Sequence, residues 1–215
     1  MTQPMQAAIP RAPRQPAVDF AGLRAKAISW ALEIAANPDV VFLDTETTGV
    51  DHTSEICDIG VVSIDGTVLV DQLVKPSIPI PDEASRIHGI TNEMVADAPT
   101  WAEVSDLVAA AVDGRAVVIY NASYDTGILR NAGRLIHRQI EMHHYCAMLA
   151  FSDWKGELGR FGTSMKWHRL DVAAAEFGIP PGGHRALQDA ETARRVVLAM
   201  AASDQERSEV DDRDD

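Results

Sequence analysis

The chain has 215 residues, 46% of them hydrophobic, and a formal net charge of −13 at pH 7, so it can bury the core of one α/β domain with extensions. It contains no run of 18 apolar residues and no secretory signal pattern, and we therefore expect a cytoplasmic protein without a membrane span. Cys57 and Cys146 lie far apart and outside any CxxC motif, which argues against a disulfide framework or a zinc site.

The N-terminal part of the chain divides into two segments. Residues 1–18 are rich in Pro, Gln and Ala without apolar periodicity, which predicts a disordered leader. Residues 19–38 are predicted to form an N-terminal helix, in which Asp19 is the cap, one face is apolar up to about Ala36, and Asn37-Pro38 ends the helix. We expect this helix to pack on the domain or on a partner.

The segment Val40–Val50, VVFLDTETTGV, ends a run of apolar residues in two carboxylates, Asp44 and Glu46. Consecutive bulky apolar residues are typical of a central strand that is covered on both faces. Because side chains alternate along a strand, both acids point to the same side, with Cα atoms roughly 6.5 Å apart. Such a pair favours bound cations. The spacing alone is weak evidence, since roughly five acid-x-acid pairs are expected by chance in so acidic a chain.

Two β-rich segments follow, Glu55–Ile64 and Thr67–Val74, and Asp65-Gly66 between them is typical of a hairpin turn. Both are predicted to extend the sheet antiparallel to the first strand.

Proline-rich Lys75–Asp82 is predicted to cross to another layer as an extended connection. Short helices are expected after it, and Thr91 is a candidate cap of one of them. Thr100 and Glu103 form a capping-box pattern, which predicts a helix that runs to Val112.

The continuously apolar segment Ala116–Tyr120 predicts a second central strand, parallel to the first. A helix is expected from about Ser123 to Ile136, and Asp125 lies in its first turn, at the middle of the apolar stripe. Glu141–Tyr145 is a candidate short strand.

The segment Trp154–His168 combines glycines with aromatic and basic residues. Two interpretations remain open for it, an ordinary solvated loop and a contact for nucleic acid. The residues concerned are Trp154, Phe161, Trp167, Lys155, Arg160, Lys166 and the adjacent Arg169.

The last predicted helix, Arg185–Ala202, also carries an acid, Asp189, on its buried stripe in the first turn. An acid on a core-facing stripe is unusual unless it is paired or bound to a metal. His184 follows Pro180-Pro181-Gly182-Gly183, so we expect a flexible loop from which it can reach the acids as a general base. His88 is a weaker candidate, either structural or next to the substrate. Residues 203–215, which hold seven acids and two arginines, are predicted to be an acidic disordered tail.

Three motifs resemble those of the DEDDh 3′-to-5′ exonucleases, whose members include the epsilon proofreading subunit of bacterial DNA polymerase III and ribonuclease T. They are DTETTG at Asp44–Gly49, NASYD at Asn121–Asp125 and HRALQDA at His184–Ala190. The resemblance covers about Val40–Met200. It implies an α/β fold of the ribonuclease-H-like type, a mixed five-stranded sheet flanked by helices, over residues 39–202.

The resemblance also implies roles for individual residues. The implied ligands of two Mg²⁺ or Mn²⁺ ions are Asp44, Glu46, Asp125 and Asp189, with His184 as the base. The residues assigned to substrate contact are Thr47, Thr48, Gly49, His88 and Asn121. Tyr120 and Tyr124 stand where many members have His and Phe, which leaves the subfamily open but removes no ligand.

The expected reaction is hydrolysis of phosphodiesters. Two divalent ions can activate water, neutralise the phosphate and stabilise the leaving oxygen, and ligands that are all oxygen favour Mg²⁺ or Mn²⁺ over zinc. We expect release of nucleoside 5′-monophosphates from the 3′ end of single-stranded DNA, in proofreading or repair, with a DNA polymerase subunit as a candidate partner of the N-terminal helix. Because the chain is so acidic, we expect its grip on nucleic acid to be limited to the terminal nucleotides.

Two alternatives remain open. One is a 3′-to-5′ exoribonuclease of the ribonuclease T or oligoribonuclease type, since no residue separates DNA from RNA. The other is a non-catalytic adaptor associated with a polymerase, against which the intact set of ligands argues.

Overall fold

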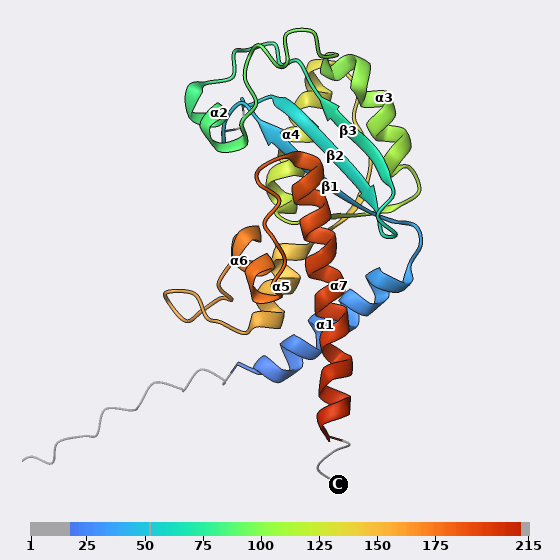
Figure 1. The fold of residues 1–215 in the computed structure, drawn as a ribbon, viewed down its shortest axis with the longest axis vertical. Coiled ribbons are helices and arrows are strands. Elements are labelled where there is room, and N and C mark those ends of the chain that lie inside the picture. Colours follow the sequence, from blue (N-terminus) through green and yellow to red (C-terminus); the bar gives the residue numbers. More distant parts are fainter. Residues whose placement is uncertain (1–17, 52, 212–215) are drawn as a thin grey trace, which may run out of the picture.

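The computed structural model describes residues 18–51 and 53–211, and for 204–211 it describes the backbone alone. Its centre is a five-stranded sheet with strand order β3-β2-β1-β4-β5, and Figure 1 shows β3, β2 and β1 side by side. β1 pairs antiparallel with β2 and parallel with β4, β3 is antiparallel to β2, and β5 is parallel to β4. The strands are β1 (Val40–Thr47), β2 (Ile56–Ser63), β3 (Val68–Leu73), β4 (Ala116–Ile119) and β5 (His143–Cys146). The predicted mixed sheet, its hairpin and its parallel central pair are confirmed.

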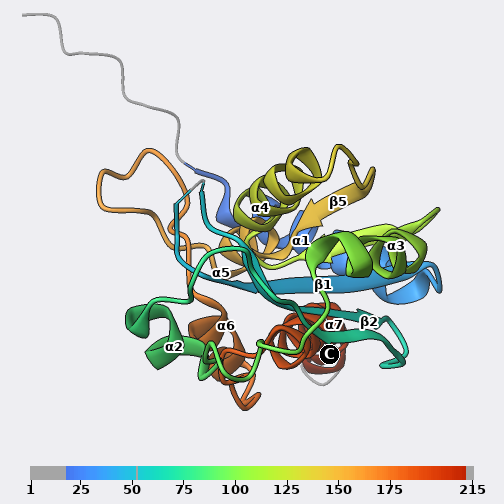
Figure 2. The ribbon, with the colours of Figure 1, turned by 90° about the horizontal axis from the view of Figure 1, so that it is seen from above.

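Helices cover both faces of this sheet, because the central strand β1 is apolar on both. Val40 and Phe42 point into a core shared with α1, α5, α6 and α7, whereas Val41 and Leu43 point into a core shared with α3 and α4. Figure 2 shows α3 and α4 on one side of the sheet and α6 and α7 on the other. The helices are α1 (Phe20–Ala36), α2 (Asp82–His88), α3 (Trp101–Val112), α4 (Ala122–Leu135), α5 (Ala147–Lys155), α6 (Leu170–Glu176) and α7 (Ala186–Asp211).

The N-terminal helix α1 packs on the domain itself. Asp19 is its N-cap and accepts a hydrogen bond from the Gly22 backbone N–H (2.9 Å). Its buried face lies against α5 and α7 and consists of Ala27, Ile28, Ala31 and Ile34. The predicted leader, apart from Val18, lies outside the described residues.

The sequence placed some helix boundaries wrongly. The helix predicted to end at Ala202 continues as α7 to Asp211, and Ser203, assigned to the tail, accepts a hydrogen bond from the indole N–H of Trp154 (3.0 Å). Thr91 caps no helix, since the residues after it form turns. The Asn92 side chain there exchanges two hydrogen bonds with the backbone of Ile80 (2.8 and 2.9 Å), which favours a turn over a helix. Helices α5 and α6 were not predicted.

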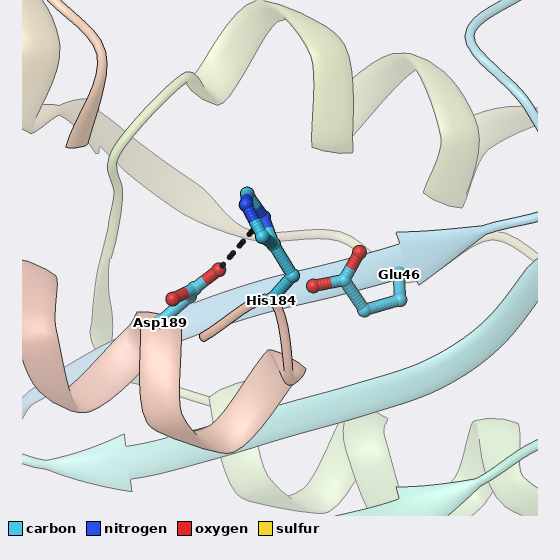
Figure 3. A group of neighbouring side chains, drawn as sticks. All are labelled: Glu46, His184 and Asp189. Carbon is cyan, nitrogen blue, oxygen red and sulfur yellow. Dashed lines mark ion pairs between the residues drawn. The ribbon is translucent and has the colours of Figure 1, made fainter. Parts of the chain in front are cut away.

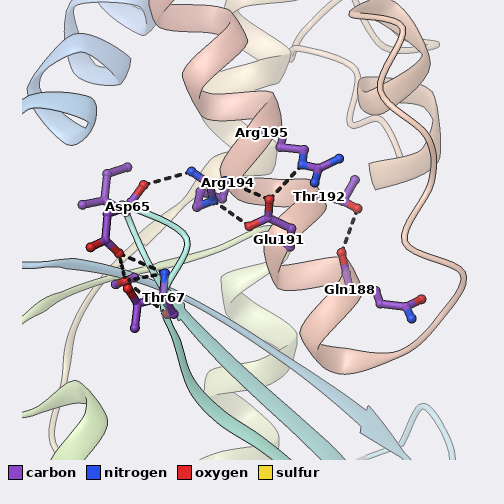
Figure 4. A network of polar contacts seen from close by, with 9 residues as sticks. Asp65, Thr67, Gln188, Glu191, Thr192, Arg194 and Arg195 are labelled. Atoms are coloured by element: carbon purple, nitrogen blue, oxygen red, sulfur yellow. Dashed lines mark hydrogen bonds and ion pairs between the residues drawn. The ribbon is translucent and has the colours of Figure 1, made fainter.

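Helix α7 lies across the sheet and continues past it beside α1 (Figure 1). Its polar face is tied to the turn between β2 and β3, where Arg194 donates to the Ile64 carbonyl oxygen (2.9 Å) and to the Glu191 carboxylate (2.6 and 2.8 Å) (Figure 4). The bond to Ile64 joins α7 to the sheet, and the bonds to Glu191, one turn earlier in α7, orient the guanidinium. Within the described part of the chain, no helix has the length and apolar character that a membrane crossing requires.

Candidate active site

The candidate site begins at the end of β1, where the strand leaves the apolar core. Asp44 and Glu46 lie on the same face and are half-buried. Their partners across the antiparallel pair are Gly60 and Asp58 of β2. The site is therefore built where two strands pair, on a rigid part of the fold.

Asp125 enters from the first turn of α4 and is almost fully buried, with 3% of its surface exposed. The Thr45 backbone N–H and hydroxyl both donate to its Oδ1 (3.2 and 2.8 Å). These bonds hold one carboxylate oxygen against β1.

Asp189 enters from the first turn of α7, and two glycines allow its close approach. A methyl group at Gly60 would lie 2.6 Å from the Ala186 carbonyl carbon and closer still to Leu187, so only glycine lets α7 begin this close to β2. A methyl group at Gly182 would lie 2.8 Å from the Asp189 nitrogen. The loop and helix thus fold tightly around Asp189.

His184 lies on the loop directly before α7, in a left-handed conformation (φ 58°) that is rare for a residue other than glycine. Its Nδ1 is 3.9 Å from Asp189 Oδ2, and half of its side chain is exposed. Figure 3 shows Glu46, His184 and Asp189 pointing into one space, and each offers a possible ligand atom within 4.8 Å of the others. The imidazole is near enough to serve as a base or as a ligand.

The four carboxylates repel one another in a poorly hydrated place. Burial, followed by the charges of Asp125, Asp189 and Glu46, raises the pKa of Asp44 well above its ordinary value. Burial and the same kind of repulsion raise the pKa of Glu46 to about 8. Burial raises the pKa of Asp125 to about 7 against the opposing effect of the Thr45 hydrogen bonds, and burial also raises the pKa of Asp189.

This donor set fits divalent cations. Carboxylate oxygens are hard ligands suited to Mg²⁺ or Mn²⁺. Among the protein's own cations, Arg185 lowers the pKa of Glu46 and His184 lowers that of Asp189, yet both pKa values remain raised. Bound cations would relieve this repulsion. Among the described residues, the ligand atoms that all lie within 4.8 Å of one another belong to Glu46, His184 and Asp189, and Asp44 and Asp125 lie outside that group.

Three of the residues assigned to substrate contact, Thr47, Thr48 and Gly49, use polar groups in hydrogen bonds that shape the turn after β1. Thr47 Oγ1, the Tyr124 hydroxyl and the Gly49 carbonyl oxygen lie 2.6 to 2.7 Å from one another. Thr48 Oγ1 accepts a hydrogen bond from the Glu55 N–H (3.0 Å), and both threonine side chains are buried. Their hydroxyls hold the end of β1 in place beside α4.

The other two assigned residues differ in exposure. His88 is 5% exposed, its Nδ1 accepts from the Ile90 N–H (3.0 Å), its Nε2 lies 3.8 Å from Cys57 Sγ, and burial lowers its pKa. Of its two predicted roles, the structural one agrees better with this burial. Asn121 is exposed at the N-terminus of α4 and accepts from the Ser123 hydroxyl (3.3 Å), so it is open to a ligand.

Asp58 was not predicted from the sequence; it is 1% exposed and lies opposite Glu46. Asp58 Oδ2 accepts from Arg185 Nε (2.8 Å) and from the Ala186 N–H (3.3 Å), and therefore joins β2 to the start of α7. The available signal was an acid inside the apolar run of β2.

The chain is similar in sequence to a family of exonucleases and to individual relatives. Residues 41–197 match the family model RNase_T, which is described as an exonuclease. An uncharacterized exonuclease of Escherichia phage 186, CP81, is 40% identical over 172 residues, which are 76% of this chain and 88% of the phage protein. The DNA polymerase III subunit epsilon of Escherichia coli K12 is 30% identical over 174 residues, which are 74% of this chain and 70% of that subunit.

Solved structures agree with the sequence comparison. Exonuclease X in complex with 5′ overhanging duplex DNA superposes with a TM-score of 0.55 at 27% identity, over 76% of this chain and 92% of that one. The nuclease domain of 3′hExo, a DEDDh family member bound to rAMP, has a TM-score of 0.60 at 16% identity, over 78% of this chain and 94% of that one. These likenesses confirm the predicted ribonuclease-H-like fold.

Proposed function

Because this chain belongs to the exonuclease family whose model matches residues 41–197, we propose that it is a metal-dependent 3′-to-5′ exonuclease that acts on single-stranded DNA ends. The observation that carries the proposal is the convergence of four mutually repelling carboxylates from β1, α4 and α7 with an exposed histidine beside them. This arrangement suits hydrolysis of the terminal phosphodiester, which releases a nucleoside 5′-monophosphate.

Each group of the site has a task in this reaction. The four carboxylates would hold two Mg²⁺ or Mn²⁺ ions, which supply charge neutralisation at the phosphate and at the leaving 3′ oxygen. His184 accepts the proton of the attacking water as the new P–O bond forms. The P–O3′ bond breaks, and the leaving 3′ oxygen takes a proton from solvent. Because half of its side chain is exposed, His184 can then return the proton to solvent. Asp58 and Arg185 keep the start of α7, and therefore Asp189, against the sheet.

A directional assay tests the reaction. DNA and RNA of one sequence, labelled at the 5′ end, are incubated with Mg²⁺, Mn²⁺ or EDTA. We expect a ladder that shortens one nucleotide at a time with either metal, faster for DNA, and no cleavage in EDTA. Immediate release of a labelled mononucleotide would show the opposite direction, and a preference for RNA would favour the exoribonuclease alternative.

Substitution of the carboxylates tests the site itself. Asp44→Asn and Asp125→Asn should each reduce kcat/KM by about 10²-fold or more, because each removes a charge that would hold a cation. Asp113→Asn, at an exposed acid at the end of α3, is the matched control. A folded Asp44→Asn variant with activity close to that of Asp113→Asn would contradict the assignment.

His184 has a second candidate role, that of a ligand, because its ring lies within ligand range of Glu46 and Asp189. If His184 is the base, His184→Ala should retain its Mn²⁺ affinity and lose about 10²- to 10⁴-fold in rate. A loss of Mn²⁺ affinity by titration calorimetry would instead identify a ligand.

The proposed partner, a DNA polymerase subunit, follows from the likeness to epsilon subunits. The apolar face of α1 is already buried against α5 and α7, so docking through this helix would use the apolar side chains that stay partly exposed, Leu32 and, beside Gly156 at the start of the helix, Phe20. Double substitution of these two residues by serine should abolish co-purification with the polymerase and leave exonuclease activity on short strands intact. Unchanged co-purification would exclude α1 as the docking site.

A further inference from the structure

An ordered hairpin loop connects α5 to α6, and we call residues Glu157–Arg169 the aromatic hairpin. Leu158 and Met165 form an antiparallel bridge, and backbone bonds join Lys166 N–H to the Glu157 carbonyl (2.8 Å) and Gly159 N–H to the Ser164 carbonyl (2.8 Å). The hairpin is therefore held by a backbone ladder that fixes where its side chains lie.

Two aromatic side chains of this hairpin face solvent. Phe161 is 83% exposed and Trp167 is 65% exposed, whereas Phe151 and Trp154 of the adjoining helix α5 are buried. Large exposed aromatic groups on one short segment are typical of a binding surface, and flat rings are the surfaces on which unpaired bases stack.

The aromatic hairpin is basic in an acidic chain. It carries Arg160, Lys166 and Arg169 against a single acid, Glu157, although the whole protein has a net charge of −13. Lys166 pairs with Glu157 (3.0 Å) and Arg169 with Asp171 (3.1 Å). Arg160 lies over the Phe161 ring at 5.9 Å, and it has no ion pair with any described residue. A cation beside a stacking ring can contact a phosphate of the same strand.

The end of the hairpin opens directly into the candidate active site. Arg169 and the first residues of α6 line a cavity of about 300 Å³ together with Gly182, His184 and Asp189. The root of the hairpin is fixed by Tyr120, whose hydroxyl lies 3.1 Å from the His168 carbonyl and 3.3 Å from the Arg169 carbonyl. Tyr120 follows β4, and only Asn121 separates it from α4, which carries Asp125. One strand end therefore positions both a candidate ligand and the hairpin.

We propose that the aromatic hairpin binds the single strand on the 5′ side of the hydrolysed nucleotide, with bases stacked on Phe161 and Trp167 and a phosphate near Arg160. This inference rests on the proposed function, because it takes the 3′ end to lie at the four carboxylates. The strand would pass from the carboxylates along the cavity beside His184 to the hairpin. Such a surface gives an acidic protein a local contact with its substrate without a broad basic face.

The test compares a long strand with a single-nucleotide substrate, which is too short to reach the hairpin. Full-length Phe161→Ala and Trp167→Ala variants are measured for kcat/KM on single-stranded dT12 and on the p-nitrophenyl ester of thymidine 5′-monophosphate. Loss of one stacked base corresponds to roughly 5- to 150-fold in affinity. We expect the loss on dT12 to be at least about five times larger than the loss on the ester, and to appear in KM. Equal losses on the two substrates, or none on dT12, would overturn the proposal.

Controls separate stacking from folding and from the proposed function. Leu135→Ala removes an apolar side chain of similar exposure (68%) at the far end of α4 and should not change the dT12-to-ester ratio. Phe161→Trp should bind dT12 as tightly as the wild-type protein does. Phe161→Leu keeps the bulk of the side chain but has no ring, so it should bind dT12 as weakly as Phe161→Ala. Arg160→Gln should make the log–log salt slope of dT12 binding shallower by about 0.7, the value for one phosphate contact with a single strand.

Binding is also measured without turnover, with the Asp44→Asn protein, fluorescent dT12 and Ca²⁺. If wild-type protein hydrolyses neither substrate, the proposed function fails, yet a loss of dT12 binding upon Phe161→Ala would still support the hairpin. The hairpin substitutions are also combined with Asp44→Asn for this measurement. If wild-type protein hydrolyses dT12, and the combined variants bind dT12 as tightly as Asp44→Asn alone, the hairpin proposal fails and the proposed function stands.

Discussion

Replacing Gly60 by alanine tests whether the close approach of α7 to the sheet positions Asp189. The added methyl group would lie 2.6 Å from the Ala186 carbonyl carbon and closer still to the Leu187 backbone, where ordinary contacts are 3.4 Å or more. The obstacle is backbone, so no side-chain rotation can relieve it. The start of α7 must move away from β2 by about 1 Å, and Asp189 moves with it.

The expected effects follow from that displacement. A shift of about 1 Å in a catalytic group costs about 10²-fold in rate, and overpacking costs about 1–3 kcal/mol of stability, or roughly 2–12 °C in Tm for a protein of this size. We expect Gly60→Ala to retain its fold, to melt lower by this amount and to lose about 10²-fold in kcat/KM on a 5′-labelled 12-mer.

Gly127→Ala is the matched control. Gly127 lies in α4, two residues after Asp125 and about 200° around the helix from it, and a methyl group there meets no atom within 4 Å. Alanine in a helix should be neutral or stabilising by up to about 1 kcal/mol. If Gly60→Ala keeps the kcat/KM and Tm of Gly127→Ala, the close backbone contact at Gly60 does not position α7.

Three further predictions concern the carboxylates. Millimolar Mg²⁺ or Mn²⁺ should raise Tm, because bound cations relieve the repulsion; an unchanged melting curve would argue against the cation site. In EDTA, Tm should fall as the pH rises from about 5 to about 8. In the folded protein Glu46 and Asp125 have pKa values of about 8 and 7, so they keep protons that the same groups in the unfolded chain have already released. A Tm that rises over this range would refute the reasoning. Asp58→Asn should lower the free energy of unfolding in urea by roughly 1–3 kcal/mol, since it weakens the hydrogen bond from partly exposed Arg185. An unchanged free energy of unfolding would show that this pair does not stabilise the fold.

Elements with a strong local signal were predicted correctly from sequence. The apolar run that ends in Asp44 and Glu46 is β1, and Thr100 with Glu103 forms the predicted capping box of α3. Asp125 lies buried in a first turn as predicted. Apolar periodicity, caps and turn residues act within a few positions of the chain, so they can be read without knowledge of the fold.

Elements whose stability comes from distant contacts were missed. Helix α5 buries Phe151 and Trp154 against Phe177, a partner more than twenty residues further along the chain. The turn after Thr91 is fixed by Asn92, which bonds to Ile80 across twelve residues. Neither pattern is recognisable until the two segments are known to be neighbours.

The sequence by itself determined that Asp44, Glu46, Asp125 and Asp189 would lie on core-facing positions and which strand would lie at the centre of the sheet, but not that Asp58 would be buried. Only the tertiary structure decided what surrounds them. Gly60 is an ordinary strand glycine until α7 begins opposite it, and Asp58 has no evident role until Arg185 and the Ala186 N–H reach it from more than 120 residues away. The root of the aromatic hairpin lies beside the site, where Tyr120 bonds to it across 48 residues. Such pairings depend on strand order and helix crossover, which bring distant parts of the chain together, and local periodicity carries no record of them.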